Sequence, residues 1–446
     1  FWGAQLEEGS FPTSYIPTSG STVQRLADEI TLTNSGIFNP NSFTIINKDF
    51  GVAAGSDTLT IIGDGSNAKC TFVYNSTLNQ TQYNAASGKT DDWWEWRVLG
   101  SSFALLNAVT DGQVTIDWGD GSTDTLSSGT TGIPEHTFTN GSGYHIIKFR
   151  LDSGTYFMPR MSNNATHKTK VISAGPIPES LGLDPLEAFD GCSNLLSADF
   201  IFTPINNRVK EIFSTCTNLK SCPNIDTSSV TDFSKMLNGV QYLTRLPDID
   251  TSNGTNFNHA WYNTGRFTLV VFPNYNLTSG LNFGRAFAIR NLTTLPVFDL
   301  RNATNLNAAW TDMRGVVTFP GAQVRDATTF NAAWSYNTAL TTFPAGFWDD
   351  WTGTPSSNCL QGMYSFAPLT ATSAENILTS VANSGQSAPA SGTDIDFNYN
   401  TGTGVPYGGS VDSNGIIRLA NGVDQPQPIV DLKSRGWTPK LNNVYQ

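Results

Sequence analysis

The second half of the chain repeats one pattern of apolar residues about every 24 positions. In each unit an apolar residue is followed by a second four positions later, by a third about six positions further on, and usually by a proline. Prolines 223, 247, 273, 296, 320 and 344 follow one another in steps of 24, 26, 23, 24 and 24 residues. The apolar positions are Val209, Phe213 and Leu219; Phe233, Leu237 and Leu243; Phe257, Trp261 and Phe267; Phe283, Phe287 and Leu292; Leu306, Trp310 and Val316; Phe330, Trp334 and Leu340; with weaker matches at Phe189, Leu195, Cys359, Met363 and Leu369. This regularity predicts stacked structural repeats.

The spacing inside one unit predicts a short helix followed by a short strand. Residues four apart lie on the same face of a helix. The Thr-rich segments before the prolines, such as 293–295 and 341–343, end on an apolar residue and are typical of a short strand, which the proline ends because it has no N–H to donate. One helix and one strand do not bury their apolar side alone, so we expect roughly seven or eight coils stacked as a parallel-strand solenoid.

Residues 114–154 have the pattern of antiparallel strands joined by tight turns. VTIDWGDGSTDTL (114–126) alternates apolar and polar positions around an Asp-Gly hairpin signal at 120–121. EHTFTNGSGYHIIKFRLDSG (135–154) alternates at Tyr144 and Ile146, and WEWRV (94–98) supplies an earlier strand. The motif IDWGDG…H-x-F…G-x-Y is similar to the PKD domain, a small β-sandwich of cell-surface proteins. The resemblance implies structural roles for Trp118 and His136.

The repeats also carry a resemblance to a known family. AFDGCSNL (188–195), IFSTCTNL (212–219) and IDTSSVTDFSKMLNGVQYLTRLPDIDTS (225–252) resemble BspA-type leucine-rich repeats of bacterial and phage surface proteins. The similarity covers about residues 185–370. Trp261, Trp310 and Trp334 stand where the family often has Phe, and a large apolar ring fills the same slot.

The two ends of the chain complete the expected organisation. WGAQLEEGSFPTSYIPTSGSTVQRLADEI (2–30) resembles the terminal strand and exit segment of laminin-G-like sandwiches in phage tail proteins, and 31–92 alternates as further strands (SFTIIN, TLTIIGDG, CTFVYN). After the repeats, an amphipathic segment at 373–385 begins a cap that protects the last coil. We therefore expect a mainly β, multidomain protein: a β-rich region 1–92, a PKD-like sandwich 93–155, a linker 156–184, a leucine-rich-repeat solenoid 185–370 and a cap 371–446.

Charge and composition exclude several kinds of partner. Charged residues make up 14% of the chain, the net charge is −12, and the 25 Lys and Arg are scattered. Nucleic acid requires basic residues clustered on one face, so it is not an expected ligand. No apolar run approaches the ~20 residues that cross a bilayer, so no membrane insertion is expected. The first residues have neither the basic nor the apolar region of a signal peptide, so none is expected there.

Residues that could carry chemistry are better explained as structural. The acid pairs 91–92 and 349–350 are adjacent in sequence, whereas hydrolytic carboxylates face each other ~5–10 Å apart across a cleft. The four His and five Cys lack the spacing of a zinc site. Asp117, Asp120 and Asp124 could bind calcium, although turns explain them better. We expect no catalytic residues, no metal and no cofactor.

Two sets of residues share a slot in different coils. Cys192 and Cys216 each follow a slot phenylalanine by three positions, and we favour small buried filling over a disulfide. Trp261, Trp310 and Trp334 belong to the core by the same periodicity, not to a sugar-binding stripe. Aromatic residues outside the slots are the better ligand contacts, because exposed rings stack on sugars and anchor interfaces. The candidate binding residues are Tyr262, Tyr336, Trp348, Trp351 and Tyr364.

These observations predict a non-enzymatic protein of the phage virion surface, such as a tail fibre, spike or head decoration. Its expected partners are a host surface glycan or protein and other virion proteins, and a homo-oligomer is left open. A bacterial cell-surface adhesin is the first alternative, because it shares every module. A glycan-degrading enzyme with a site spread over the solenoid is the second.

Overall fold

The computed structural model describes residues 92–446, apart from 176, 179–180, 199–203, 223–224, 268, 270, 391–392 and 400–402, together with three earlier strands. The chain divides into two units, Phe1–Asp91 and Asp92–Gln446. In the first unit, β1 (Thr58–Ile62), β2 (Lys69–Asn75) and β3 (Gln80–Asn84) form one antiparallel sheet. Two strands predicted there, at TLTIIGDG and CTFVYN, are therefore present. The laminin-G-like segment 2–30 lies outside the described residues.

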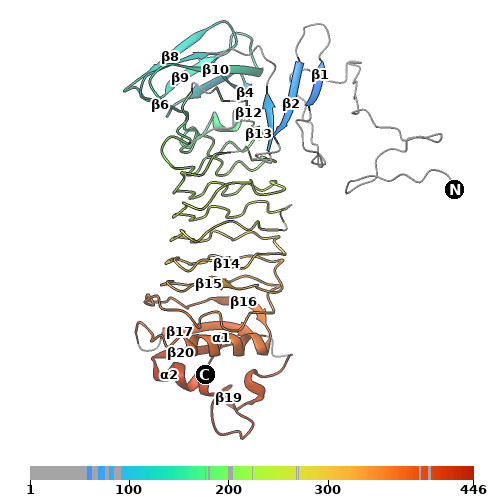
Figure 1. Ribbon diagram of the computed structural model, residues 1–446, viewed down its shortest axis with the longest axis vertical. Helices are drawn as coiled ribbons and strands as arrows, with labels where there is room; N and C mark the ends of the chain where they lie inside the picture. The colour runs from blue at the N-terminus through green and yellow to red at the C-terminus, as the bar shows by residue number, and fades with distance from the viewer. Residues whose placement is uncertain are drawn as a thin grey trace, which may run out of the picture. The chain divides into compact units, whose positions relative to one another are not determined.

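The second unit begins with several β-sheets (Figure 1), and we refer to this region by its predicted fold as the sandwich. Its elements are β4 (Trp94–Gly100), β5 (Ser102–Leu105), β6 (Val109–Thr110), β7 (Gln113–Asp117), β8 (Thr123–Ser127), β9 (Ile133–Thr137), β10 (Gly143–Ser153), β11 (Phe157–Met158), the 3-10 helix η1 (Lys168–Lys170), β12 (Val171–Ala174) and β13 (Ser197–Ala198). The main sheet has the order β13-β12-β4-β10-β7-β8, and β5-β9 and β6-β11 form two small pairs. Val114, Ile116 and Trp118 point inward, as the alternation predicts. Tyr144 and Ile146 point outward instead, because the buried set of β10 consists of the intervening residues.

The segment 156–184, expected as a linker, is instead part of the sandwich. It carries β11, η1 and β12, and β12 pairs with β4 at the edge of the main sheet. The buried side chain of Asn164 donates a hydrogen bond to the carbonyl of Ala104, 2.7 Å away. Trp96 of β4 packs on Phe189 of the first repeat with ring centres 5.0 Å apart. The sandwich and the repeats therefore share one continuous core.

Residues 185–369 wind through successive turns of about 24 residues that lie on one another (Figure 1), and we refer to them as coils. Parallel bridges join equivalent positions in neighbouring coils, including Arg208 to Asp232, Asp232 to Asn256 and Asn256 to Asn282. All the apolar slot residues predicted from the sequence are buried except one. Phe267 is 53% exposed, and Leu269 occupies its slot because this coil has two additional residues.

The coils are built from turns, not from the short helices predicted by the four-residue spacing. Among the described residues between 181 and 363 there is no α-helix, and the named strands β14 (Phe298–Asp299) and β15 (Ala322–Gln323) are two residues long. Along one turn segment of each coil alternate N–H groups bond to the next coil, as Glu211 does to the carbonyl of Ser234 (3.0 Å) and Phe213 to that of Met236 (3.1 Å). The N–H of Ile212 bonds locally, to the carbonyl of Val209. The helix prediction is wrong because these alternate N–H groups bond to carbonyl groups of the next coil. In an α-helix they would bond to carbonyl groups four residues earlier in the same segment.

The chain ends in a small α/β cap (Figure 1). Its elements are β16 (Tyr364–Leu369), α1 (Ala371–Asn383), β17 (Thr393–Tyr399), the 3-10 helix η3 (Pro406–Gly408), β18 (Ser410–Val411), β19 (Ile417–Arg418), α2 (Gln427–Ser434), β20 (Trp437–Leu441) and β21 (Val444–Tyr445). The sheet order is β16-β17-β20-β21, so the last coil continues into the cap sheet. Ser373 and Ser380 of α1 are buried and accept hydrogen bonds from the N–H groups of Phe343 (2.9 Å) and Trp348 (2.7 Å). The polar face of α1 thus satisfies backbone groups at the end of the stack.

Candidate functional site

The structure buries three of the five aromatic residues predicted as ligand contacts. Trp348, Trp351 and Tyr364 are at most 1% exposed, so the prediction that they contact a ligand is wrong. The coil that begins at Phe330 is longer than its neighbours and folds its additional rings inward. The indole N–H of Trp351 donates to the carbonyl of Ala327, and the Tyr364 ring stacks on a slot tryptophan. An aromatic residue outside the 24-residue pattern is therefore not necessarily a surface residue.

Tyr336 is on the surface and stacks against a second exposed ring. Its side chain is 51% exposed, and that of Phe366 in β16 is 59% exposed. The two ring centres are 4.8 Å apart and the planes differ by 20°. The N–H of Tyr336 donates to the carbonyl of Ser365, 2.8 Å away, which fixes the two coils in register. The rings form one apolar platform on the outside of the stack.

Both residues of this platform have a left-handed backbone. Tyr336 has a φ of 61° and Phe366 a φ of 66°, which bulky side chains rarely adopt. The left-handed turn recurs at the position of Tyr336 in other coils, where the residue is Thr215, Gly239, Asn263 or Asp312, and of these glycine and asparagine tolerate it best. At Phe366 the pairing of β16 with β17 shifts register. Two strained aromatic residues that meet on the surface suggest that the rings serve a purpose beyond folding.

Charged groups occupy the coil next to Tyr336. Asp312 is the equivalent residue in that coil, and its N–H donates to Ser335, the neighbour of Tyr336. The Asp312 carboxylate pairs with Arg290 (2.9 Å) and with Arg314 (2.6 Å), and all three side chains are partly exposed. An apolar ring face beside several N–H donors and a carboxylate suits a sugar, which has C–H faces and a rim of hydroxyl groups. We call Tyr336, Phe366, Asp312, Arg290 and Arg314 the aromatic platform site.

The sequence pointed to Tyr336 but to none of the other four residues of this site. Phe366 was missed because the register shift within β16 decides that its side chain faces outward. The pattern of apolar residues along the sequence gives no sign of that shift. Arg290, Asp312 and Arg314 lie in two coils and pair only after the coils stack. Tyr262, the remaining predicted residue, is partly exposed in an earlier coil, with its ring centre 5.4 Å from that of His259.

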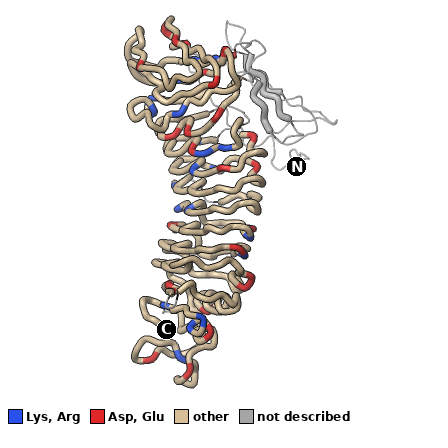
Figure 2. Tube along the Cα trace, turned by 90° about the vertical axis from the view of Figure 1, so that its left-hand side faces the viewer, with Lys and Arg blue, Asp and Glu red and all other residues tan. Residues whose placement is uncertain are grey.

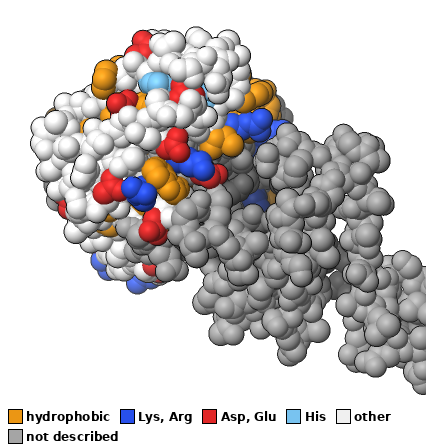
Figure 3. Space-filling model, turned by 90° about the horizontal axis from the view of Figure 1, so that it is seen from above, with side chains coloured by type: hydrophobic (Ala, Val, Ile, Leu, Met, Phe, Trp, Pro, Cys, Tyr) orange, Lys and Arg blue, Asp and Glu red, His pale blue; other side chains and the backbone are white. Residues whose placement is uncertain are grey.

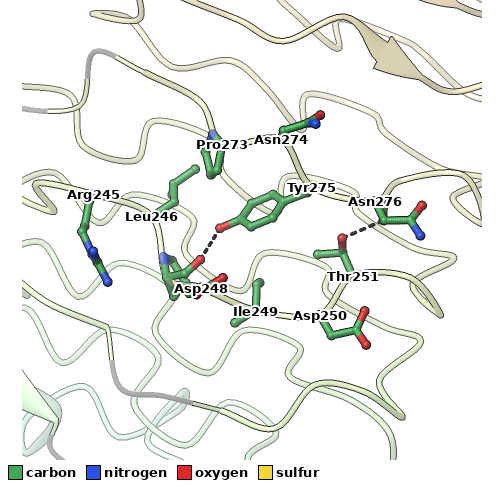
Figure 4. Close-up of a pocket in the computed structure, with 11 residues that line it drawn as sticks. Arg245, Leu246, Asp248, Ile249, Asp250, Thr251, Pro273, Asn274, Tyr275 and Asn276 are labelled. Atoms are coloured by element: carbon green, nitrogen blue, oxygen red, sulfur yellow. Dashed lines mark hydrogen bonds between the residues drawn. The ribbon is translucent and has the colours of Figure 1, made fainter. Parts of the chain in front are cut away.

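A shallow pocket of about 340 Å³ lies between two coils, lined by residues 245–251 and 273–276 (Figure 4). The hydroxyl of Tyr275 points toward the facing coil and donates to the carbonyl of Pro247. Burial raises the pKa of the Tyr275 phenol. The hydroxyl of Thr251 donates to the carbonyl of Asn276, 2.6 Å away. These polar groups hold the two coils together, so the pocket is a weaker candidate than the aromatic platform site.

The Gly-Asp-Gly turn of the sandwich is a structural centre. The Trp118 ring stacks on His136 with centres 4.6 Å apart. The inaccessible side chain of Asp120 bonds to His136 (2.9 Å), to Ser122 and to the N–H of Thr139 (2.9 Å). Burial alone would raise the pKa of Asp120, but these hydrogen bonds outweigh it and hold the pKa well below the usual value. The geometry agrees with the structural roles expected for Trp118 and His136.

The other two aspartates considered for calcium bind separate groups. Asp117 accepts a hydrogen bond from the N–H of Gly119, and Asp124 accepts one from the indole of Trp118, both at 2.8 Å. Within the described residues no cluster of three or more His, Cys, Asp or Glu could hold a metal ion. Cys192 and Cys216 are buried and free, and burial raises the pKa of both thiols, which agrees with the favoured interpretation as core filling.

The sandwich end also exposes small apolar patches among charged side chains (Figure 3). Leu99 of β4 lies opposite Tyr144 of β10, and Ile146 lies opposite Arg97. The Arg97 guanidinium is 4.3 Å from the centre of the Tyr144 ring. This face is more mixed in character than the aromatic platform site, and nothing in its geometry selects a ligand.

No family model, curated protein or solved structure matches the chain. No helix in the described part of the chain is both long and apolar enough to span a bilayer.

Proposed function

We propose that this chain is a non-enzymatic attachment protein of the phage virion surface, which binds a host surface glycan through the aromatic platform site. The observation that carries the proposal is the stacked pair of Tyr336 and Phe366. The rings meet on the outside of the coils, at positions where a left-handed backbone makes aromatic residues costly. The neighbouring ion pairs of Asp312 supply hydrogen-bonding groups at the rim of the platform.

The module assignments belong to the same proposal. We infer that the coils are a BspA-type leucine-rich-repeat solenoid, which is supported by the 24-residue spacing of buried slots and of parallel bridges. We infer likewise that the sandwich is PKD-like, supported by the packing of Trp118, His136 and Asp120 around the Gly-Asp-Gly turn. Both modules resemble those of surface proteins, and this combination favours an attachment role over an intracellular one.

Binding of the full chain to an array of purified bacterial surface polysaccharides tests the glycan role. We expect the double variant Tyr336→Ala/Phe366→Ala to lose binding, because each ring contributes about 1 kcal/mol of stacking, or about fivefold in affinity. The matched control is Tyr242→Ala/Phe267→Ala. It removes another exposed aromatic pair, whose rings are tilted instead of stacked and whose centres are 5.3 Å apart. Equal binding by both double variants would contradict the proposal. Recovery of the polysaccharide with its length unchanged would support a non-enzymatic role.

The location of the protein is tested separately. A virion surface protein should be found in purified particles and seen on them by cryo-microscopy. If the chain were instead recovered only with bacterial envelopes, the alternative of a cell-surface adhesin would replace it, with the same aromatic platform site.

A further inference from the structure

A row of basic side chains runs along three successive coils. Lys235, His259 and Arg285 occupy the same position in their coils, each with a φ between 52° and 56°. The N–H of Lys235 donates to the carbonyl of Asn258, which precedes His259 in the chain. The N–H of His259 donates in the same way to the carbonyl of Gly284, which precedes Arg285. Parallel coils are about 4.8 Å apart, so the row presents basic groups at that interval. We call these three residues the basic row.

The acidic residues that continue this row are already neutralised. The preceding coils carry Glu211 and Glu187 at the same position. Glu211 pairs with Lys235 at 3.0 Å, and Glu187 pairs with Arg160 at 2.8 Å. Arg285 is exposed and has no ion pair with any other described residue. Because the same ion pair neutralises Lys235, the permanent positive charge left unpaired in the basic row is that of Arg285, and His259 adds a second when it is protonated, in a chain whose net charge is −12. Charged residues are sparse over most of the coils (Figure 2).

His259 is oriented so that one nitrogen remains for a ligand. Its Nδ1 is 2.7 Å from the side-chain oxygen of Asn258, which holds the proton of the neutral ring on Nδ1. The nitrogen of the Asn258 amide lies against Gly284, where a Cβ would approach it to 2.7 Å. The Tyr262 ring borders the imidazole edge-on. Protonation of His259 would add an N–H donor at Nε2 beside Arg285.

We propose that the basic row is a second binding site, specific for a linear anionic glycan that carries carboxylate or phosphate groups along its length. The inference rests on the proposed attachment role and names the charge of the glycan. Nucleic acid is disfavoured, because duplex DNA carries one charge per about 1.7 Å and requires more cations than this row offers. A glycan with anionic groups more widely spaced matches basic groups one coil apart. The Tyr262 ring supplies an apolar contact for a sugar.

The pH dependence of binding follows from the surroundings of His259. The ionisable groups near it are Lys235 and Arg285 in the adjacent coils, Glu211 beyond Lys235, and Tyr262. Burial lowers the pKa of His259, and the positive charges of Arg285 and Lys235 lower it further. An anionic ligand would reverse this electrostatic effect and favour the protonated ring. Binding should therefore strengthen as the pH falls from 7.5 to 5.5, a range in which carboxylates with ordinary pKa values near 4 stay ionised.

The experiment measures binding of the full chain to polygalacturonate and to poly(glycerol phosphate), with neutral dextran and oligo-dT for comparison. We expect one or both anionic glycans to bind more tightly than dextran and oligo-dT, and the two arms distinguish carboxylate from phosphate. Arg285→Gln should weaken binding about tenfold, since a hydrogen bond to a charged group is lost. His259→Gln should remove the pH dependence. The control, Arg325→Gln, removes an exposed arginine paired with Asp326 elsewhere on the coils and should leave binding unchanged.

Equal binding by the Arg285→Gln and Arg325→Gln variants would overturn the inference, as would tighter binding of oligo-dT than of either anionic glycan. The outcome is separable from that of the proposed function. If the Tyr336→Ala/Phe366→Ala variant loses glycan binding while Arg285→Gln keeps it, the attachment role stands and the basic row has no part in it.

Discussion

The buried tryptophans of the sandwich and the slot tryptophans of the coils are equally inaccessible, but bonded indole N–H groups are found among the former and not among the latter. In the sandwich, the indole N–H of Trp94 donates to the carbonyl of Gly175 (2.9 Å) and that of Trp118 donates to Asp124 (2.8 Å), whereas that of Trp96 is buried with no acceptor in the described part of the chain. In the coils, the indole N–H groups of three slot tryptophans are buried without an acceptor among the described residues; these are Trp261, Trp310 and Trp334. Two sandwich tryptophans thus add a polar contact to their packing, whereas the slot tryptophans of the coils act through packing alone.

The stacking of rings explains how the coils tolerate this arrangement. Trp334 lies parallel to Trp310 at 5.0 Å and to Tyr364 at 5.2 Å, so a column of rings continues from coil to coil. A buried N–H without a partner costs about 1–3 kcal/mol. Burial of a large aromatic side chain offsets that cost through its apolar area and its ring contacts. The large rings in the slots therefore stabilise the coils through their buried area, and their N–H groups add no stabilising hydrogen bond.

The largest expected effect is that of removing a ring from the column. Trp334→Ala should destabilise the second unit by about 3–5 kcal/mol, because it leaves a cavity among several rings. Chemical denaturation of the full chain, followed by tryptophan fluorescence and circular dichroism, measures the change. A loss below about 1 kcal/mol would mean that the column is not a principal source of stability.

The next effect concerns the polar centre of the sandwich. Asp120→Asn should cost about 2 kcal/mol near neutral pH, because the hydrogen bonds to its charged form are weakened. The folded-state pKa of Asp120 is lowered, so its contribution is fully present above the usual carboxyl pKa of 3.8 and is lost as the pH falls toward the folded-state pKa. The stability difference between wild type and variant should therefore be constant above about pH 5 and should shrink as the pH falls from about 4 toward 2. A stability difference that stays constant over this pH range would contradict the conclusion that Asp120 is ionised in the folded protein.

A matched pair of conservative substitutions separates the two regions most directly. Trp118→Phe removes a donor that is bonded to a carboxylate and should cost about 1.5–3 kcal/mol. Trp310→Phe removes an N–H without an acceptor and should change stability by less than about 1 kcal/mol in either direction. Phe287 already fills the same slot in the adjacent coil. Equal losses in the two variants, measured by urea denaturation, would mean that ring size alone matters in both regions.

The smallest effect is expected at the surface of the coils. Tyr336→Asn should change the free energy of unfolding by less than about 0.5 kcal/mol, because relief of the left-handed backbone offsets the lost ring contact. Glycan binding by the same variant should nevertheless fall. A loss of stability comparable to that of Trp334→Ala would show that the ring of Tyr336 is required for folding, and would remove the argument from backbone strain.

The sequence predicted the features of the fold that follow from the 24-residue repeat. It did not predict the features that depend on contacts between neighbouring coils. The slots of Phe213, Leu237 and Trp334 followed from a repeat that every coil shares, and so did their burial. The local helix did not form because alternate N–H groups bond to the next coil, a partner that the pattern of one coil does not contain. Phe267 and Trp348 were misplaced for a related reason. Each lies in a coil of unusual length, where the position of an aromatic ring depends on how the additional residues fold.

The candidate sites were predictable to a still smaller degree. Tyr336 was found by excluding slot positions, and the same rule wrongly selected Trp351 and Tyr364. The basic row was hidden because Lys235 and Arg285 are far apart in a chain whose basic residues look scattered. Only the stacking of coils brings residues of equal position together, so charge along the sequence is a poor guide to charge on the surface.

The hydroxyl groups of Ser373 and Ser380 have a consequence for the assembly of the molecule. A last coil with bare N–H groups would be a template for the first coil of another copy, and molecules would join end to end into filaments. With α1 and β17 at that end, and β12 paired with β13 at the other, both terminal coils already have a partner. The length of the stack of coils is then set by the number of repeats in the chain. A variant with one coil inserted should extend about 4.8 Å further while remaining a discrete particle.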